Sequence, residues 1–482
     1  ICHSGGDSRR TPAYAAQGKV FTPVPTAAAD NLPLALFDLI LKNLQKLPAP
    51  AGGHVLVTSG DVLLTFDHES VDLSRPGVTG VAYFGPAERG SRHGVYVPET
   101  FTGSPLRTEC VRVADFLQKP PEAEARLRGA VDPFGHVAVD TGLLSFDPDT
   151  CAELLDAAER AGGRAHGGIL GELETGRCPA LDLYEDLTMA LAPRYDERRY
   201  VERVSTARGA DNAHKRRMGR FYRSMRAIPF QVNVVPYCDF FHIGSSRELL
   251  TGFSSLSRTA REYCFANGSG ASVAGDCGSS FIFNSYVRCR VKAVNALIEG
   301  VHAERCRRLD LKGENILTGL PPEAAVPMCL GKGTGLACLP VGRAGWAAVA
   351  YGLDDDFKTP FGGDRPCLFL NAPVEEWLDK NGIKASRLWR GDAADGMWRA
   401  RLWRVGPVDA VVAEAVAVAR GAGLDTACRG RRFSLAELIP MVDHNRLLGL
   451  RQEIRRHVNL AKVAERVLAD DTLSASAVCG DI

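Results

Sequence analysis

The sequence lacks any C-x-x-C pair and any other cysteine spacing that holds zinc, although it contains 14 cysteines among its 482 residues. The cysteines are spread from Cys2 to Cys479, so we expect reduced, buried thiols in a cytoplasmic protein and no disulfide framework. An excess of charge is also missing. The 58 basic and 57 acidic residues give a formal net charge of +1, so we expect no nucleic-acid partner, and any phosphate recognition must be local.

No hydrophobic run is long enough to cross a membrane. The longest run, at residues 405–424, is interrupted by Asp409, Glu414 and Arg420, so we expect no membrane contact. A signal peptide is also missing, although the chain opens on Ile1 without a methionine. The hydrophobic content of 45% and the charged content of 24% are those of an ordinary globular protein, and this length predicts about three domains.

The first twenty-five residues are rich in the groups that bind phosphate. Adjacent glycines, Gly5 and Gly6, let the backbone turn with positive φ, so that successive N–H groups converge on phosphate oxygens. Ser8 follows, Arg10 offers a bidentate fork, and Lys19 adds a compact charge. We therefore predict nucleotide binding at these five residues. The spacing matches neither a Walker loop nor a Rossmann fingerprint, and a glycine-rich turn beside a solvated basic segment stays open as an alternative.

This stretch resembles the opening motif of the sugar-nucleotide pyrophosphorylases, G-G-x-[GS]-x-R followed by a lysine and then P-V. Here the motif reads Gly5-Gly6-Asp7-Ser8-Arg9-Arg10, then Lys19, then Pro23-Val24. The form HSGGDSRR…GKVFTPVP is similar to the fucose-1-phosphate guanylyltransferase branch, which includes the N-terminal half of the bifunctional fucokinase/GDP-fucose pyrophosphorylases.

The resemblance implies a nucleotidyltransferase that forms GDP-L-fucose and pyrophosphate from GTP and L-fucose 1-phosphate, with Arg10, Lys19 and Asp61 as catalytic residues. Two alternatives stay open. The chain could be a guanylyl- or uridylyltransferase for another hexose 1-phosphate, or a non-catalytic sugar-nucleotide-binding subunit.

Asp61 is the residue expected to hold Mg²⁺. It follows the apolar strand at residues 55–57, and ligands of open α/β sheets collect at the carboxyl ends of strands. In the pyrophosphorylases that the chain resembles, a G-D at this point carries a magnesium-binding aspartate. A turn aspartate that ends a strand would look the same.

The second metal ligand is open. Mannose-1-phosphate guanylyltransferases read D-I-G-T where this chain reads H-I-G-S, which places His242 at the position of the second metal-binding aspartate. His242, Asp182 and Asp186 are the three alternatives, and an acidic residue in a first helical turn also suits the helix dipole without any metal.

The sugar-phosphate site is expected at two further segments. Lys119 stands in a Q-K-P context that binds the sugar-linked phosphate in related enzymes. Asp140-Thr141-Gly142 replaces the N-A-G or N-S-G of relatives, whose polar residue touches sugar hydroxyls. A short acid can accept from two hydroxyls, but a surface lysine and a turn-capping aspartate are the alternatives.

We expect an α/β nucleotidyltransferase of the GT-A/Rossmann-like kind at residues 1–250, with a mixed sheet and helices on both faces. Apolar segments that begin at Ile282, Leu297 and Ile316 recur at an average step close to the eighteen-residue coil of a left-handed parallel β-helix, which we assign to residues 251–345. A mixed α/β extension at 346–433 and a helical segment at 434–482 complete the prediction.

Two later features are assigned more simply. The acidic run at residues 354–356, next to Lys358, is interpreted as a solvated turn, with a metal site as the alternative. The loop P-x-x-x-G-L-[GS]-S-S of the sugar kinases that follow this region in bifunctional enzymes does not occur in the 482 residues. We therefore expect the kinase half to be absent from this chain, while a C-terminal sugar-kinase domain in a longer protein stays open.

Overall fold

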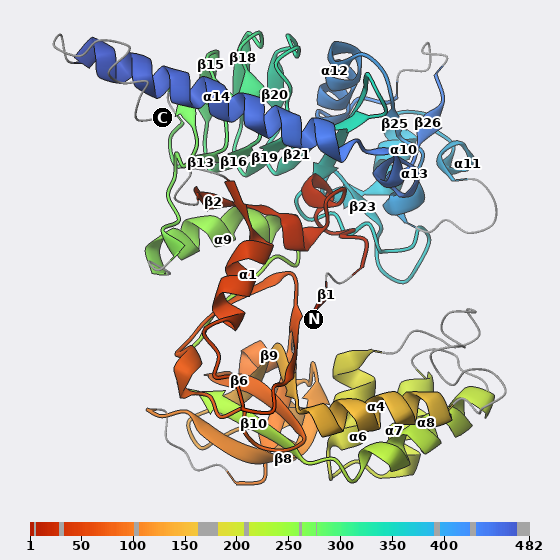
Figure 1. Cartoon of the computed structure of the whole chain (residues 1–482). Coiled ribbons are helices and arrows are strands. Elements are labelled where there is room, and N and C mark those ends of the chain that lie inside the picture. Colours follow the sequence, from red (N-terminus) through yellow and green to blue (C-terminus); the bar gives the residue numbers. More distant parts are fainter. Residues whose placement is uncertain are drawn as a thin grey trace. The chain divides into compact units, whose positions relative to one another are not determined.

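A computed structural model of the chain describes residues 1–3, 6–27, 33–100, 106–161, 182–206, 212–259, 263–275, 277–389, 396–424 and 430–469. The chain packs into two units (Figure 1). The first contains Ile1–His3, Ile40–Ser59 and Leu64–Phe240, and the second contains Ser4–Leu39, Gly60–Leu63 and Phe241–Ile482. Residues 1–250, which the sequence assigns to one catalytic domain, therefore contribute to both units.

The first unit is built on a seven-stranded mixed sheet, as expected for an α/β fold. Its strand order is β1 (Cys2–His3), β4 (Val55–Ser59), β9 (His136–Phe146), β6 (Val78–Pro86), β10 (Phe230–Val235), β8 (Glu109–Gln118) and β7 (Gly94–Pro98). β1 runs parallel to β4 and β10 parallel to β6, while the remaining pairs are antiparallel. All six residues of β10 are buried, and the buried amide of Asn233 is satisfied because it exchanges hydrogen bonds with the backbone of Asp72.

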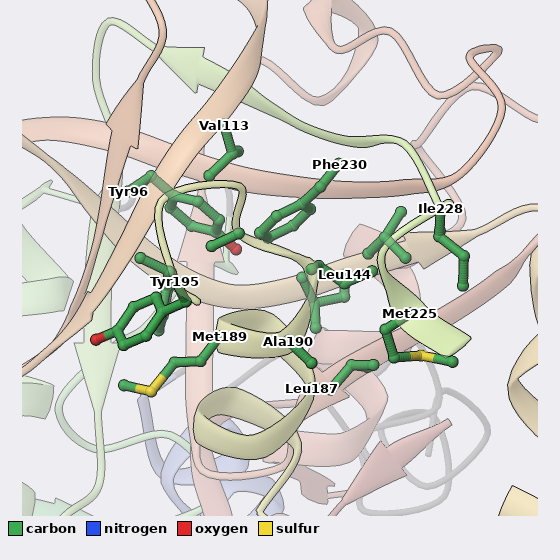
Figure 2. Packing of buried hydrophobic residues seen from close by; sticks show 14 of the residues in the cluster. Tyr96, Val113, Leu144, Leu187, Met189, Ala190, Tyr195, Met225, Ile228 and Phe230 are labelled. Atoms are coloured by element: carbon green, nitrogen blue, oxygen red, sulfur yellow. The ribbon is translucent and has the colours of Figure 1, made fainter. Parts of the chain in front are cut away.

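Helices of the first unit pack on this sheet through one hydrophobic core. The helices are α4 (Pro148–Ala161), α6 (Thr188–Leu191), α7 (Glu197–Thr206) and α8 (Asn212–Met225). Figure 2 shows Tyr96, Leu144 and Phe230 of the strands beside Met189 of α6 and Met225 of α8. Burial of each such large side chain stabilises the fold by roughly 1.5–3 kcal/mol.

A bulge in β9 shapes the sheet where the sugar-phosphate residues were predicted. Val81 pairs with Leu143 but the next residue, Ala82, pairs with Asp140, so Thr141 and Gly142 are inserted without partners on β6. Gly142 has φ +75°, which a residue with a side chain rarely adopts. Bulges of this kind re-aim a side chain, here that of Asp140.

The second unit contains a stack of parallel strands, called here the strand stack, between residues 272 and 341. Successive stretches of chain add one strand to each of three parallel sheets. The sheets are β12 (Ser272–Val273), β14 (Tyr286–Val287) and β17 (His302–Ala303); β13 (Phe281–Phe283), β16 (Ala296–Glu299), β19 (Asn315–Thr318) and β21 (Thr334–Val341); and β15 (Arg290–Ala293), β18 (Arg308–Leu311) and β20 (Met328–Leu330). The three apolar segments with a repeating step fall in β13, β16 and β19, which are neighbours in one sheet.

Two elements that follow the strand stack in the chain pack against it. β22 (Gly345–Gly352) pairs antiparallel with β21, and the long helix α14 (His444–Ala469) lies along the stack (Figure 1). Arg451 of α14 donates to both carboxylate oxygens of Glu299 in β16, at 2.9 and 3.1 Å. Glu299 is fully buried, so this pairing is what makes its charge tolerable inside the stack.

None of the helices in the described ranges has the length and apolar character needed to cross a membrane.

The remaining helices and strands of the described ranges are η1 (Pro12–Tyr14), η2 (Lys19–Phe21), β2 (Pro23–Ala27), β3 (Pro33–Ala35), α1 (Leu36–Leu44), β5 (Val62–Thr65), η3 (His68–Ser70), α2 (Ala87–Gly90), α3 (Glu122–Leu127), η5 (Leu183–Leu187), β11 (Asp239–His242), α9 (Ser246–Thr259), β23 (Leu368–Phe369), β24 (Ala372–Pro373), α10 (Val374–Lys380), α11 (Ala385–Leu388), η7 (Met397–Arg399), β25 (Trp403–Arg404), α12 (Val408–Ala419), β26 (Arg432–Phe433), α13 (Leu435–Leu438) and η8 (Ile439–Met441).

Candidate functional site

Lys19 and Asp61 meet in the second unit. Lys19 begins the short helix η2, directly after Gly18 with φ +77°, and Asp61 stands at the turn that leads into β5. The Lys19 Nζ lies 3.0 Å from Asp61 Oδ2, and the two side chains are only 5% and 14% exposed. The structure therefore joins two of the residues selected from the sequence in one sheltered ion pair.

His242 lies beside this pair. Its Nε2 is 3.6 Å from Asp61 Oδ2, and its Nδ1 is 3.5 Å from Glu248 Oε2. The backbone holds the arrangement, because the Ile243 N–H donates to the Asp61 carbonyl at 2.8 Å and the Gly244 N–H donates to Glu248 at 2.8 Å. His242 thus faces a carboxylate with each of its two ring nitrogens.

The glycine loop is anchored next to α9. Gly6 has φ +73°, and Ser8, which is buried, also has a left-handed φ of +54°. Such a backbone conformation costs a serine roughly 1–3 kcal/mol and is typical of ligand-binding loops. The carbonyl of Arg10 accepts from the N–H and the hydroxyl of Ser246 at 3.0 and 3.2 Å. Gly5 lies outside the described residues.

Lys358 joins the basic residues of this loop, and the sequence analysis did not select it. Its pKa is lowered, first by burial of the ammonium and then by the positive charges of Arg10, Lys19 and Arg9. Arg9 is already paired with Asp7 at 2.7 Å. The basic cluster, defined as Arg9, Arg10, Lys19 and Lys358, is therefore a concentration of positive charge in a chain with almost none in excess. Like charges are held this close where an anion is to be bound.

The acidic run next to Lys358 departs at its middle residue from the solvated turn that we expected, while Asp354 is exposed in a turn as expected. Asp355 is buried and accepts from the backbone N–H groups of Gly352, Leu370 and Asn371 at 2.7, 3.0 and 2.9 Å. These donors lie where β22 ends and where β23 turns toward β24. Asp355 is a structural residue, and the expectation was wrong because the sequence does not show which backbone donors need an acceptor.

Asp140 is buried in the first unit. Burial raises the pKa of its carboxyl to about 6, although the Gly142 N–H, which donates at 2.9 Å, and the nearby Tyr96 hydroxyl oppose the rise. Gly94 makes room for this carboxylate. A Cβ added at Gly94 would lie 3.1 Å from Asp140 Oδ2 and 2.5 Å from the ring of Phe116.

Thr141 and Gly142 mainly hold the bulge in place. The Thr141 hydroxyl is buried and donates to the Val81 carbonyl at 2.6 Å. The Gly142 carbonyl accepts from the Tyr184 hydroxyl at 2.9 Å, and that hydroxyl lies 2.6 Å from His3 Nε2. Tyr184 thus links the bulge to His3 of β1. Neither Tyr184 nor His3 was selected from the sequence, since neither residue stands out without the fold.

Lys119 and Asp186 also belong to the first unit. Lys119 is exposed at the end of β8 with φ +50°, a strained conformation for the residue before a proline. This strain favours a functional lysine over an incidental surface one. Asp186 is buried in η5, and its Oδ2 accepts the Asp182 N–H at 2.7 Å. Asp182 itself caps η5 by accepting from the Tyr184 and Glu185 N–H groups.

The donors around Asp61 fit magnesium better than zinc. Within the described ranges, no third ligand atom of a histidine, cysteine or acid joins Asp61 and His242 in one cluster. Mg²⁺ is typically held by one or two carboxylates and takes its other ligands from water and substrate phosphates. A single carboxylate beside a basic, glycine-rich loop therefore suits a magnesium–nucleotide complex.

Comparisons with known proteins identify the family to which the chain belongs. A family model described as the fucose pyrophosphorylase domain matches residues 1–407. The L-fucokinase/L-fucose-1-P guanylyltransferase of Bacteroides fragilis is 27% identical over 395 residues, which are 80% of this chain and 36% of that protein. The bifunctional fucokinase/GDP-fucose pyrophosphorylase of Arabidopsis thaliana is 27% identical over 439 residues, 84% of this chain and 38% of that protein. The chain thus spans well under half the length of these relatives.

Two further matches are shorter. The fucose-1-phosphate guanylyltransferase of Homo sapiens is 25% identical over 269 residues, 53% of this chain and 43% of that protein. The solved UDP-glucose pyrophosphorylase from Acinetobacter baumanii covers 43% of this chain and 53% of its own at 10% identity. Its TM-score of 0.23 is too low to support an argument about the fold.

Proposed function

The chain belongs to the fucose pyrophosphorylase family, and from this premise we propose that it makes GDP-L-fucose and pyrophosphate from GTP and L-fucose 1-phosphate. The single observation that carries the proposal is the sheltered Lys19–Asp61 pair, 3.0 Å apart, beside a glycine loop where Arg10, Lys19 and Arg9 lie near enough to lower the pKa of Lys358.

The reaction asks mainly for positioning and charge neutralisation. An oxygen of the sugar phosphate attacks the α-phosphorus of GTP in line, a new P–O bond forms, and the bond to the β-phosphate breaks as pyrophosphate leaves. Arg10, Lys19 and Lys358 would neutralise the triphosphate and the departing pyrophosphate. A preorganised positive group costs no reorganisation when the charge develops, which is why such contacts raise the rate.

Asp61 would hold Mg²⁺. His242 lies next to it, but its nitrogen donors suit Mg²⁺ less well than oxygen donors do. When bound, the ion neutralises phosphate charge. In the chain itself, Lys19 balances the Asp61 carboxylate in the absence of a nucleotide, which keeps both side chains in position. Asp186 is less suited to the metal, because its carboxylate already serves the backbone of Asp182.

The sugar phosphate would bind through the first unit. Lys119 would contact the phosphate, since it is exposed and held in a strained backbone conformation. Asp140 would accept from sugar hydroxyls, and with a pKa of about 6 it is mostly ionised at pH 7. Thr141 and Gly142 would contribute through the shape of the bulge, because the Thr141 hydroxyl is engaged by Val81.

We add two proposals, one about the fold of the second unit and one about the cellular location. We interpret the strand stack as the predicted left-handed β-helix, in line with its three parallel sheets and its repeating step. We also place the protein in the cytoplasm, because all eleven cysteines in the described ranges are free.

The decisive experiment is a pyrophosphate-release screen that crosses GTP, ATP, UTP and CTP with the 1-phosphates of fucose, mannose, glucose and galactose. The proposal predicts the highest kcat/KM for GTP with fucose 1-phosphate. Activity with a different pair would support a transferase for another hexose 1-phosphate. Nucleotide binding without pyrophosphate release from any pair would instead favour the non-catalytic subunit.

A matched pair of variants links the activity to the site. Asp61→Asn should reduce turnover by about a hundredfold to a thousandfold, the usual cost of one preorganised electrostatic contact. Asp364→Asn, an exposed aspartate of the same unit, should leave turnover unchanged. Equal turnover in the two variants would argue against the metal-binding role of Asp61.

A further inference from the structure

Two histidines and a glutamate gather at a place that the proposed reaction does not use. His302 begins β17 in the strand stack, and Glu453 and His457 stand four residues apart on α14, so their side chains share one face of that helix. One ligand atom from each of the three residues lies within 4.8 Å of the others. The cluster therefore connects the strand stack with the C-terminal helix.

His302 is buried without the partners that a buried imidazole needs. Its side chain is 1% exposed, and neither ring nitrogen makes a hydrogen bond. The closest approach of a carboxylate is that of Glu304, whose Oε2 is 3.6 Å from Nε2, beyond hydrogen-bond distance. Buried polar atoms nearly always make hydrogen bonds. The unbonded ring of His302 therefore either lowers the stability of the fold or binds a ligand.

The surroundings fix the two rings toward each other. The ring centroids of His302 and His457 are 4.7 Å apart, and the ring of Tyr286 lies 5.3 Å from the first and 5.0 Å from the second. The buried Arg451–Glu299 ion pair anchors α14 two residues before Glu453. The helix register is thereby set so that Glu453 and His457 face the strand that carries His302.

The donor set selects one class of ligand. Two imidazole nitrogens and a carboxylate oxygen are the ligands of zinc and its first-row neighbours, whereas Mg²⁺ and Ca²⁺ prefer oxygen alone. The ring nitrogens of His302 make no hydrogen bond, so a lone pair of this ring can be given to an ion. Glu453 and His457 retain solvent access, so an ion has a path of entry.

We propose that His302, Glu453 and His457 form a binding site for a divalent transition-metal ion of the zinc class, which fastens α14 to the strand stack. The ion would satisfy the orphaned imidazole of His302 and leave a coordination position for water. The site is structural, distinct from the candidate magnesium residue Asp61, and independent of the proposed transferase activity.

The test uses the full chain after removal of metals with EDTA. Co²⁺ is titrated in as a spectroscopic probe, and we expect one visible d–d absorbing ion per chain, displaced by Zn²⁺ and not by excess Mg²⁺. Glu453→Gln and His457→Gln should each weaken Co²⁺ binding by at least about tenfold, because loss of even an outer-shell partner costs that much. Glu465→Gln and His444→Gln, on the same helix, are the matched controls and should bind as the wild type does.

A stability readout keeps the proposal independent of activity and of local misfolding. His302→Ala alters a buried position and can disturb folding, so the partly exposed Glu453 and His457 carry the test, with circular dichroism to confirm their folded state. Zn²⁺ should raise the Tm of the wild type by mass action and leave that of His457→Gln unchanged. The proposal is overturned if the wild type binds no stoichiometric Co²⁺, or if His457→Gln and His444→Gln bind it equally.

Discussion

The ammonium of Lys19 and the carboxylate of Asp61 form an ion pair at 3.0 Å, although the residues stand 42 positions apart in the chain. Both side chains are largely removed from water, at 5% and 14% exposure, so each depends on the other for its charge to be tolerated. The pair therefore does two things at once. It stabilises the second unit, and it holds an ammonium group and a carboxylate group at the glycine loop.

Lys19→Met should affect both roles, and a double variant should separate them. Turnover should fall by about a hundredfold to a thousandfold, because a preorganised positive contact to the polyphosphate is lost. The variant should also lose about 3 kcal/mol of unfolding free energy, since it removes the ammonium from the sheltered Asp61 carboxylate. Kinetics at saturating GTP and urea unfolding measure the two effects. In the double variant Lys19→Met/Asp61→Asn, most of the unfolding free energy should be regained, whereas the turnover should stay low. If the losses of unfolding free energy in the two single variants simply add up in the double variant, the ion pair does not stabilise the fold.

Lys358→Met tests the residue that the sequence did not reveal. Loss of one charge-assisted contact, worth about 1.5–3 kcal/mol, should raise the KM for GTP by roughly tenfold to a hundredfold. The free protein should become slightly more stable, because the lowered pKa of Lys358 shows that its charge is disfavoured beside Arg10 and Lys19. Lys384→Met, an exposed lysine of the same unit, is the control and should change neither quantity. An unchanged KM for GTP in Lys358→Met would remove this lysine from the nucleotide site.

The contrast between Lys19 and Lys358 shows which site residues can be predicted from the sequence. Lys19 and Asp61 could be selected because each belongs to a short motif, and the repeating step of the strand stack is visible because stacked strands need apolar residues at regular positions. Lys358 belongs to no motif and follows an acidic run, so only the folded chain brings it to Arg10. The same holds for Gly94, whose missing side chain makes space for Asp140 on a neighbouring strand.

Asp140 predicts a pH dependence of both stability and activity. Its pKa of about 6 in the folded chain lies above the value of about 3.9 for an unfolded aspartate. The folded state therefore binds the proton more tightly, so the stability contribution is complete below pH 4 and is lost as the pH rises through 6. Asp140→Asn should accordingly be more stable than the wild type at pH 7, by up to about 3 kcal/mol, and equally stable below pH 4. Asp149→Asn, at an exposed aspartate, should show no such difference.

The same titration should appear in the kinetics. If the ionised carboxylate accepts from the sugar hydroxyls, the kcat/KM for fucose 1-phosphate should fall as the pH drops through 6, while the KM for GTP changes little. In Asp140→Asn this limb of the profile should disappear along with much of the activity. A profile that keeps its acid limb in the variant would assign the titration to another group.

Gly94→Ala tests whether the space around Asp140 determines the choice of sugar. The added Cβ would lie 2.5 Å from the Phe116 ring and 3.1 Å from Asp140 Oδ2, so ring and carboxylate must both move. Overpacking of this kind costs about 1–3 kcal/mol of stability, and displacement of the carboxylate should raise the KM for the sugar phosphate while the KM for GTP stays constant. Gly52→Ala, where a Cβ meets no atom within 4 Å, is the matched control in the same unit. Both variants add one methyl group. A rise in the KM for the sugar phosphate in Gly94→Ala alone would therefore tie the effect to Asp140. Equal KM values for the two variants would show that the carboxylate does not touch the sugar.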